Sequence, residues 1–382
     1  MRNTFRGITM KKTIVILFGV LAVIAAFSAA PLAAQTADTG IPDRSYKSWS
    51  ALPILMYDPD IGVGYGGKAK FVDFLGHKES FDLILFNSSK GERWYVFTFQ
   101  IPDIEVRQGK TYKISFDLKA EYDKYLNYSY YGVGMGSSKD NESLLTHETK
   151  NLQLTLGRGF TPNVIVEASY VLRSIDYYDF REGDKGYLAP ELLTLEKKFA
   201  PYVSLVLRFD TSDSQIHPTT GVRLMFQDDF AAGLVGSKDA SFNRLTVDFR
   251  KYFLVFGAKD VFAFRTLVQY VGGDSIPLFD LSSLGGGGTL TCMRGYSLNR
   301  FLDKGKFLAN AEYRFPIFWR LGGNAFVDLG NVWPSLGDIS WGKTAVDYGL
   351  GLRFYMPDFA VRVDVGFSKE GMGLYFNFNH VF

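Results

Sequence analysis

Cysteine and histidine are scarce in this chain, which has one cysteine and four histidines among 382 residues. Cys292 has no partner for an internal disulfide, and a single cysteine excludes any multi-cysteine metal site. The histidines form no cluster with the spacing of metal ligands; they are His77, His147, His217 and His380. The sequence therefore predicts neither a bound metal nor another cofactor.

Signs of nucleic-acid binding and of catalysis are also lacking. The 42 Lys and Arg residues nearly balance the 40 Asp and Glu residues, and a net charge of +2 does not indicate nucleic acid as a partner. The glycine run 285–288 is followed by neither a helix nor a Lys-Ser/Thr pair, so it is not a phosphate loop. A barrel lipase needs a Ser and a His in reach of each other, and the pair Ser143 and His147 falls in a segment expected to be a solvated loop. We expect no enzyme activity.

Long apolar runs are absent after the N-terminus, where a single run covers residues 13–30. Basic residues precede this run, and the small residues Ala33 and Ala34 follow it. This order is typical of a secretory signal peptide, so we expect residues 1–34 to be removed and residues 35–48 to form a short periplasmic segment. An uncleaved membrane anchor is the alternative, because the run is close to the shortest length that spans a bilayer.

Hydrophobic residues are nevertheless plentiful, at 47% of the chain with 16% aromatic residues, and they alternate singly with polar ones. Period-two alternation is typical of strands with one face in lipid and one toward a polar lumen. Sixteen such segments can be counted: 49–57, 61–74, 81–86, 95–99, 112–118, 147–156, 164–172, 203–209, 222–226, 245–253, 262–270, 307–315, 325–329, 348–354, 359–367 and 374–382. The sequence thus predicts an all-β protein, a transmembrane antiparallel β-barrel of about sixteen strands over residues 49–382.

The connections between these strands differ in length on the two sides of the barrel. An even number of strands puts both termini on the periplasmic side, where the expected turns are short. The expected external loops, 123–146, 179–198 and 272–306, are long and rich in Gly, Ser, Asp and Asn. The last of them lies between strands eleven and twelve.

The alternation also separates a lipid face from a lumen face in the last strands. The residues expected to face lipid are Ala311, Tyr313, Phe315, Val327 and Leu329. Those expected to face the lumen are Glu312, Arg314, Phe326, Asp328 and Gly330, extended by Arg353, Arg362 and Asp364. An arginine brought into such a lumen would be desolvated and would need a fixed carboxylate.

The third long loop carries Met293-Arg294-Gly295-Tyr296 after the glycine run, and Phe326-Val-Asp-Leu-Gly330 follows on the second strand after it. Together these segments resemble the signature of the BamA/TamA outer-membrane assembly superfamily, the bacterial surface antigen barrels. The resemblance implies that the loop folds into the barrel and that Arg294 pairs with Asp328, with Glu312 as the alternative partner. A solvated external loop with an unpaired arginine is the competing interpretation.

A second resemblance to the same family lies at residues 208–213, Arg-Phe-Asp-Thr-Ser-Asp, followed by His-Pro-Thr-Thr-Gly at 217–221. The family has here an Asp-rich segment before a Pro-Thr-x-Gly turn. Ser212 stands where family versions often carry an arginine, so this copy departs slightly from the pattern.

The last strand and the seam, the line along which the first and last strands meet, complete the expected site residues. Phe378, His380 and Phe382 fall on one face of the last strand and resemble the signal that directs barrel insertion. The family's seam is weak, and three residues fit a thin seam: Pro53, Gly371 and Gly373. The alternative is that these three residues only end strands.

The resemblance implies a function in the assembly, insertion or translocation of proteins, or of lipids, at the outer membrane. It implies outer-membrane lipid and lipopolysaccharide as surroundings, and the barrel-assembly machinery as the partner for the chain's own insertion. Family members carry POTRA domains before the barrel, and residues 35–48 are too few for one, so a separate periplasmic protein is expected to deliver substrates. The alternative is a passive channel or structural surface barrel that has lost insertion activity.

Overall fold

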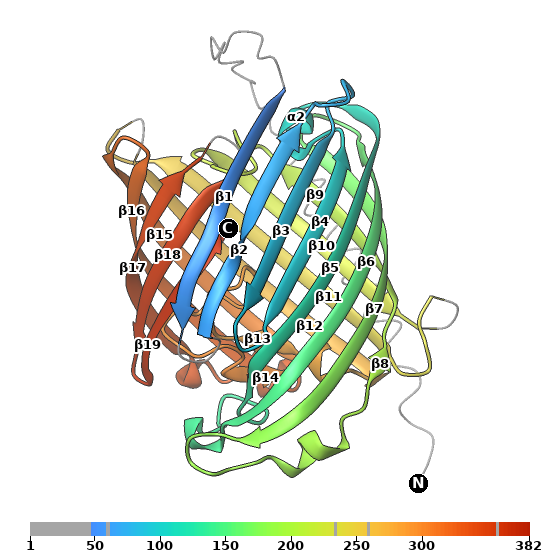
Figure 1. Ribbon diagram of the computed structural model, residues 1–382, viewed down its shortest axis with the longest axis vertical. Helices are drawn as coiled ribbons and strands as arrows, with labels where there is room; N and C mark the ends of the chain where they lie inside the picture. Colours follow the sequence, from blue (N-terminus) through green and yellow to red (C-terminus); the bar gives the residue numbers. More distant parts are fainter. Residues whose placement is uncertain (1–46, 59–61, 233–234, 258–259, 357–358) are drawn as a thin grey trace. The chain divides into compact units, whose positions relative to one another are not determined.

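The computed structural model describes residues 47–58, 62–232, 235–257, 260–356 and 359–382. The predicted signal peptide, residues 1–34, and residues 35–46 of the expected periplasmic segment lie outside the described residues. Strand is the predominant structure of the described chain (Figure 1). Within it, no helix is both long enough and apolar enough to cross a membrane.

Sixteen strands follow one another as antiparallel neighbours in one large sheet. They are β1 (Ser48–Asp58), β2 (Gly62–Val72), β3 (Ser80–Ser88), β4 (Arg93–Ile101), β5 (Tyr112–Tyr130), β6 (Ser143–Gly159), β7 (Val164–Glu182), β9 (Tyr202–Asp210), β10 (Gly221–Ala231), β11 (Ser241–Leu254), β12 (Val261–Ser275), β15 (Gly305–Phe318), β16 (Leu321–Trp333), β17 (Ala345–Tyr355), β18 (Ala360–Ser368) and β19 (Gly371–Phe378). A two-residue strand, β8 (Lys198–Phe199), adds to the edge of β7. Each of the sixteen predicted segments lies on one of these strands, so the predicted all-β fold is confirmed.

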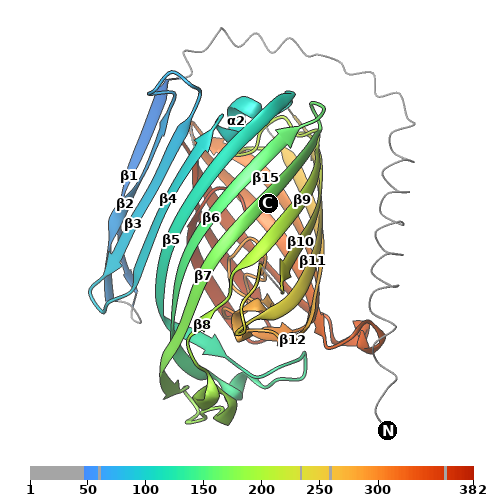
Figure 2. The same ribbon diagram turned by 90° about the vertical axis from the view of Figure 1, so that its right-hand side faces the viewer.

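The sheet curls around an interior, as the two perpendicular views show (Figure 2). Side chains alternate between buried and exposed along the strands, most regularly on β7. The exposed set is apolar: Val327 and Leu350 are 45% and 63% exposed. The buried set is charged, and Arg265, Arg294 and others are among the largest fully buried side chains. This inversion of the usual pattern is what a wall between lipid and a polar lumen requires.

Three strands are longer than the sequence predicts, because β5 and β6 take up half of the expected loop 123–146 and β7 extends into 179–198. The polar residues of these segments predict loops. Each segment instead pairs with its neighbour, since Asp123 lies opposite Thr149 and Tyr130 opposite Ser143 in the β5–β6 ladder. A backbone ladder satisfies the peptide groups whatever the side chains are, so polar composition alone did not end these strands.

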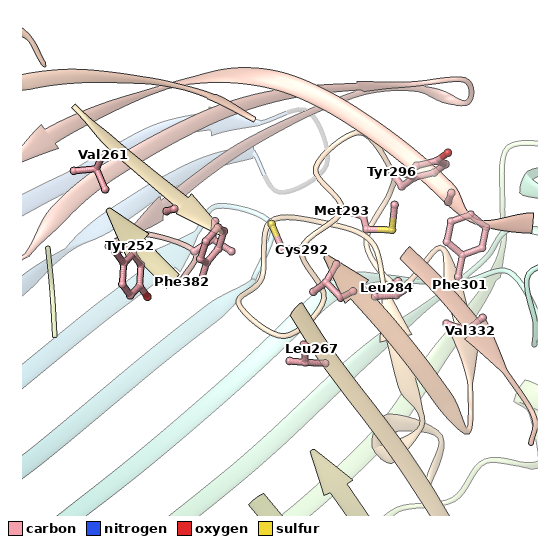
Figure 3. Packing of buried hydrophobic residues seen from close by; sticks show 14 residues of the cluster. Tyr252, Val261, Leu267, Leu284, Cys292, Met293, Tyr296, Phe301, Val332 and Phe382 are labelled. Carbon is pink, nitrogen blue, oxygen red and sulfur yellow. The ribbon is translucent and has the colours of Figure 1, made fainter. Parts of the chain in front are cut away.

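The last strand is shorter than predicted, because β19 ends at Phe378 rather than at residue 382. Asn379 has φ 60° and turns the chain out of the sheet, with its backbone N–H donating to the carbonyl oxygen of Ala360 at 2.7 Å. Phe382 is 3% exposed and packs in a buried cluster with Tyr252 and Val261 (Figure 3). The residues after Asn379 therefore leave the outer wall and contact the interior.

The two outermost strands, β1 and β19, complete the sheet. Within the described residues, no ladder joins them. A side-chain contact does cross between their neighbourhoods, because the ammonium of Lys68 on β2 lies 5.4 Å from the ring centre of Phe378. This contact links β2 to the last residue of β19.

Candidate functional site: the inner loop and its arginine lock

The inner loop, residues 276–304, connects β12 to β15 and contains a short hairpin of β13 (Ser282–Leu284) and β14 (Phe301–Asp303). It lies between the eleventh and twelfth strands of the sixteen-strand ladder, as predicted. Asp280, fully buried, anchors the start of the loop to the wall: it accepts from Arg173 on β7 at 2.5 Å and from Arg244 on β11 at 2.9 Å. Two walls of the lumen therefore hold the loop's first turn.

The tip of the inner loop is turned by two glycines with positive φ, Gly285 at 123° and Gly286 at 83°. An isolated bridge between Gly286 and Met293 then closes the tip on itself. Cys292 and Met293 are fully buried in an apolar cluster beneath it (Figure 3). The tip is a packed structure that presents the next residue, Arg294, to the wall.

Arg294 is fully buried and contacts three carboxylates, those of Asp328 and Glu312 on adjacent strands and, at 3.4 Å, that of Asp364 on β18. Its Nε and Nη2 donate to Oδ2 and Oδ1 of Asp328 at 2.9 and 2.8 Å, a bidentate pair. Nη1 donates to Oε1 of Glu312 on β15. We call Arg294, Asp328 and Glu312 the arginine lock. The resemblance named Asp328 as partner with Glu312 as alternative, and the structure brings both to the guanidinium.

Further groups complete the surroundings of the arginine lock. The guanidinium carbon lies 3.4 Å from the ring centre of Phe326, close enough for a cation–π interaction. Asn310 donates to Oδ1 of Asp328 at 2.8 Å and to the carbonyl oxygen of Cys292 at 3.0 Å. Every nitrogen of the guanidinium and both oxygens of Asp328 thus have a hydrogen-bond partner, which is the condition under which a buried ion pair is tolerated.

The backbone of the inner loop also docks on β18 and β19. The carbonyl oxygen of Gly295 accepts from Ser368 at 2.6 Å, and that of Tyr296 accepts from the hydroxyl of Tyr375 at 2.7 Å. This approach needs glycine in the wall. A Cβ on Gly366 would lie 2.3 Å from the backbone of Arg294, and one on Gly373 would lie 2.4 Å from it.

The other predicted lumen residues lie near the arginine lock. Gly330 faces Met293, whose sulfur would be 2.3 Å from an added Cβ. Arg314 donates to Glu312 at 2.8 Å and to the carbonyl oxygen of Phe382 at 2.9 Å. Arg353 donates to Asp364.

The seam and insertion-signal residues are not gathered into one site. Pro53 lies in β1 opposite Gly67, and Gly371 begins β19 with φ 145°. The sequence assigns Gly373 to a thin seam, but the backbone of Arg294 in the inner loop lies against this glycine. Phe378 ends the strand, whereas His380 and Phe382 lie beyond it, so the expected single strand face of these three residues does not exist.

Several contacts of the inner loop were not predicted from the sequence. Asn310 lies on the same inward face as Glu312, two residues before it, and the period-two pattern could have included it. Arg300, 3% exposed, donates to Glu370 at 2.6 Å and so ties the inner loop to the β18–β19 turn. Neither residue of that pair belongs to a motif, and no signal in the sequence links them.

The Ser143–His147 pair does not form a catalytic arrangement. Both residues lie on β6, and the Ser143 hydroxyl donates to the carbonyl oxygen of Tyr187 at 3.4 Å. The His147 ring stacks on Phe279 with 4.6 Å between the ring centres.

The second motif forms the connection between β9 and β10. Asp210, at the end of β9, accepts from both the backbone N–H and the hydroxyl of Ser212, at 2.8 and 2.6 Å. Arg223 on β10 donates to the same hydroxyl at 2.9 Å. Ser212, which departs from the family's usual arginine, is therefore a buried link between the two strands.

These features define the class: an antiparallel barrel whose lumen holds an inward loop fixed by a buried arginine. The chain belongs to the Omp85 superfamily of outer-membrane β-barrels, because the model of the Omp85 superfamily domain matches residues 74–382. A search of curated proteins finds no match.

Solved structures of similar fold include BamA from Haemophilus ducreyi lacking POTRA domains 1–3, with a TM-score of 0.55, 15% identity, and coverage of 88% of this chain and 70% of that one. CdiB from Escherichia coli has a TM-score of 0.57, 12% identity, and coverage of 88% and 63%. CdiB from Acinetobacter baumannii has a TM-score of 0.51, 12% identity, and coverage of 87% and 59%. The chain thus spans less than two thirds of either CdiB chain.

Proposed function

We propose that the protein resides in the outer membrane and aids the assembly, insertion or translocation of proteins, or of lipids, there. The observation that carries this proposal is the docking of the inner loop on β18 and β19, the strands beside the seam. A loop fixed at this place can hold the last hairpin against β1 or release it. It thereby controls a lateral path between lumen and lipid without any covalent chemistry.

The proposed partners follow from this role. The barrel meets outer-membrane lipid and lipopolysaccharide, depends on the barrel-assembly machinery for its own insertion, and receives substrates from a separate periplasmic protein. Export through the cleaved signal of residues 1–34 belongs to the same proposal.

Depletion of the protein followed by quantitative analysis of the outer-membrane proteome tests the assembly role. We expect a specific set of barrels or exported proteins to fall in abundance and to recover with the wild-type chain. Complementation with Asp328→Ala should restore less than complementation with Asp274→Ala, which removes an exposed carboxylate instead. An unchanged proteome would refute the assembly role.

A passive channel is the second candidate, and one observation favours it. The lumen contains a cavity of about 380 Å³ lined largely by polar side chains, among them Gln153, Gln227 and Lys306. Steady conductance of the purified protein in a planar bilayer, together with an unchanged proteome after depletion, would support the channel.

A further inference from the structure

A second cavity, of about 280 Å³, lies at the end of the barrel that carries the β15–β16 turn and the last residues of the chain. Its wall comes from four separate parts of the protein. Arg314 is on β15, Tyr355 is on β17, His217 is in the β9–β10 connection, and His380 follows β19. None of these residues takes part in the arginine lock as defined above. This cavity is called the mouth cavity below.

Arg314 is 3% exposed and uses only part of its hydrogen-bonding capacity. Its Nε donates to Glu312 and its Nη2 to the carbonyl oxygen of Phe382, but Nη1 has no hydrogen-bond partner within the part of the chain that the structure describes. A buried guanidinium N–H without an acceptor is unfavourable, because the desolvation of the donor is not offset by a hydrogen bond. The mouth cavity is the space beside this side chain where an acceptor can be placed.

The two histidine rings pack against each other in the wall of the mouth cavity. Their ring centres are 5.8 Å apart in an edge-to-face arrangement, and the His217 ring is 5.1 Å from that of Tyr355. Nδ1 of His380 is buried and has no hydrogen-bond partner among the described residues. Both side chains can donate from an imidazole N–H, and protonation would give each a second donor.

The charge around the mouth cavity is positive. Arg314 and Arg320 line it, and Arg353 acts electrostatically on His380 from β17. The acidic group that also acts on His380 is Glu312, which Arg294 and Arg314 already contact. In the β9–β10 connection, the carboxylate of Asp213 accepts hydrogen bonds from the hydroxyl and backbone N–H of Thr219 and from the backbone N–H of Thr220.

Burial favours the neutral form of both imidazoles. It lowers the pKa of His217 from 6.5 to about 4 and lowers that of His380 well below 6.5, in both cases with Arg314 adding to the effect. A bound anion would offset this effect, because an opposite charge within a few ångströms favours the protonated form.

We propose that the mouth cavity is a binding site for a phosphate group, held by Arg314, His217 and His380 with Arg320 at its rim. A tetrahedral oxyanion offers acceptors in several directions, which suits donors that converge from different strands and connections. The phosphate comes either free from solution or as the headgroup of a phospholipid. Trp319, 75% exposed beside the rim, is placed for contact with a lipid. The site does not depend on the proposed assembly role.

Isothermal titration calorimetry of the full chain in detergent micelles tests the site. Inorganic phosphate is the probe, and the ionic strength is held constant. We expect saturable binding by the wild type. His380→Gln and His217→Gln should each weaken it by about tenfold, the effect of losing one charge-assisted hydrogen bond. His77→Gln, an exposed histidine at the β2–β3 turn, is the matched control and should bind as the wild type does.

A second measurement protects the test from misfolding of a variant. As the pH falls from 8 to 6, the wild type should gain affinity relative to the double variant His217→Gln/His380→Gln, because the bound anion favours protonated imidazoles. Inorganic phosphate itself loses negative charge over this range, and the double variant corrects for that loss. Its fold is checked by circular dichroism.

A parallel experiment identifies the source of the phosphate. Native mass spectrometry after exposure to phosphatidylglycerol or phosphatidylcholine should retain one lipid on the wild type, but not on the double variant, if a headgroup occupies the site. Binding of inorganic phosphate without retained lipid would identify the free anion. Absence of saturable binding of either probe, or equal binding by the double variant, would overturn the proposal.

Discussion

Arg294 has no access to water, so its charge is tolerated only because carboxylates contact it. Both partners come from inward positions of neighbouring strands, Glu312 on β15 and Asp328 on β16. Removal of one partner from a buried ion pair destabilises a protein by about 3–5 kcal/mol, because the other charge stays buried. In this chain the unpaired charge need not stay buried, because the inner loop can move away from the wall and carry Arg294 with it.

Asp328→Ala is therefore expected to release the inner loop while the strands stay paired. Limited proteolysis should show faster cleavage around Arg294 than in the wild type. Asp274→Ala, which removes an exposed carboxylate at the end of β12, should leave the cleavage rate unchanged. Unchanged protection in Asp328→Ala would mean that Glu312 and Asp364 are sufficient to hold Arg294. Exchange of the two residues, Arg294→Asp with Asp328→Arg, should restore part of the protection.

His217 gives a prediction for pH. Burial lowers its pKa in the folded protein to about 4, below the value of 6.5 for a solvated histidine. The unfolded chain therefore binds more protons between these values, and stability is fully present above pH 6.5 and falls toward pH 4. We expect the thermal unfolding midpoint in chloride buffer to drop over this interval. His217→Gln should flatten the drop, and His77→Gln should not.

Some contacts of individual residues in this site could be predicted from the sequence, and others could not. The pairing of Arg294 with Asp328 follows from a motif whose parts occur in a fixed order. The contacts of Tyr375 and Arg300 depend on how deeply the loop enters and on the register of the last hairpin. Neither quantity is encoded in local periodicity, so these contacts had to be observed.

At the scale of elements, the β18–β19 hairpin is the platform for the loop. Its two inward glycines, Gly366 and Gly373, leave room for the backbone of Arg294. The same hairpin supplies hydrogen bonds from Ser368 and Tyr375. One strand of the platform is an outermost strand of the sheet, which couples the loop to the seam.

Gly366→Ala should separate the loop from this platform without removing any charge. The added Cβ would overlap the carbonyl of Arg294, and overpacking of this kind destabilises by about 1–3 kcal/mol. Protease access to the inner loop should rise, as in Asp328→Ala. Gly342→Ala is the control, because nothing lies within 4 Å of its added Cβ. Equal protection of both variants would show that the platform is dispensable.

Element boundaries were harder to predict than element number. Alternation along the chain is a local property and identified all sixteen strands. The ends of β5, β6 and β7 depend on whether a neighbour continues beside them, which is not local. β19 ends where Asn379 adopts a positive φ and turns the chain. The alternation of aromatic residues continues past this position, so the pattern did not predict the turn.

For the whole molecule, the inner loop occupies space through which solutes would otherwise pass. Replacement of residues 285–300 by a short flexible linker should raise the single-channel conductance in a planar bilayer. Shortening of the exposed connection 336–342, between β16 and β17, should leave the conductance unchanged. Equal conductance of both deletions would show that the loop does not limit passage.

The contacts of the inner loop also set an order of events during folding. Arg294 reaches 34 residues along the chain to Asp328, and the backbone beyond it reaches 73 and 79 residues to Ser368 and Tyr375. Contacts of long sequence separation form late, because the intervening chain must first lose its conformational freedom. The last contacts cannot close until the final hairpin exists. The arginine lock and its contacts with the β18–β19 hairpin can therefore be complete only after the last strands are in place. The moment at which Arg294 becomes protected from protease would mark the end of barrel folding.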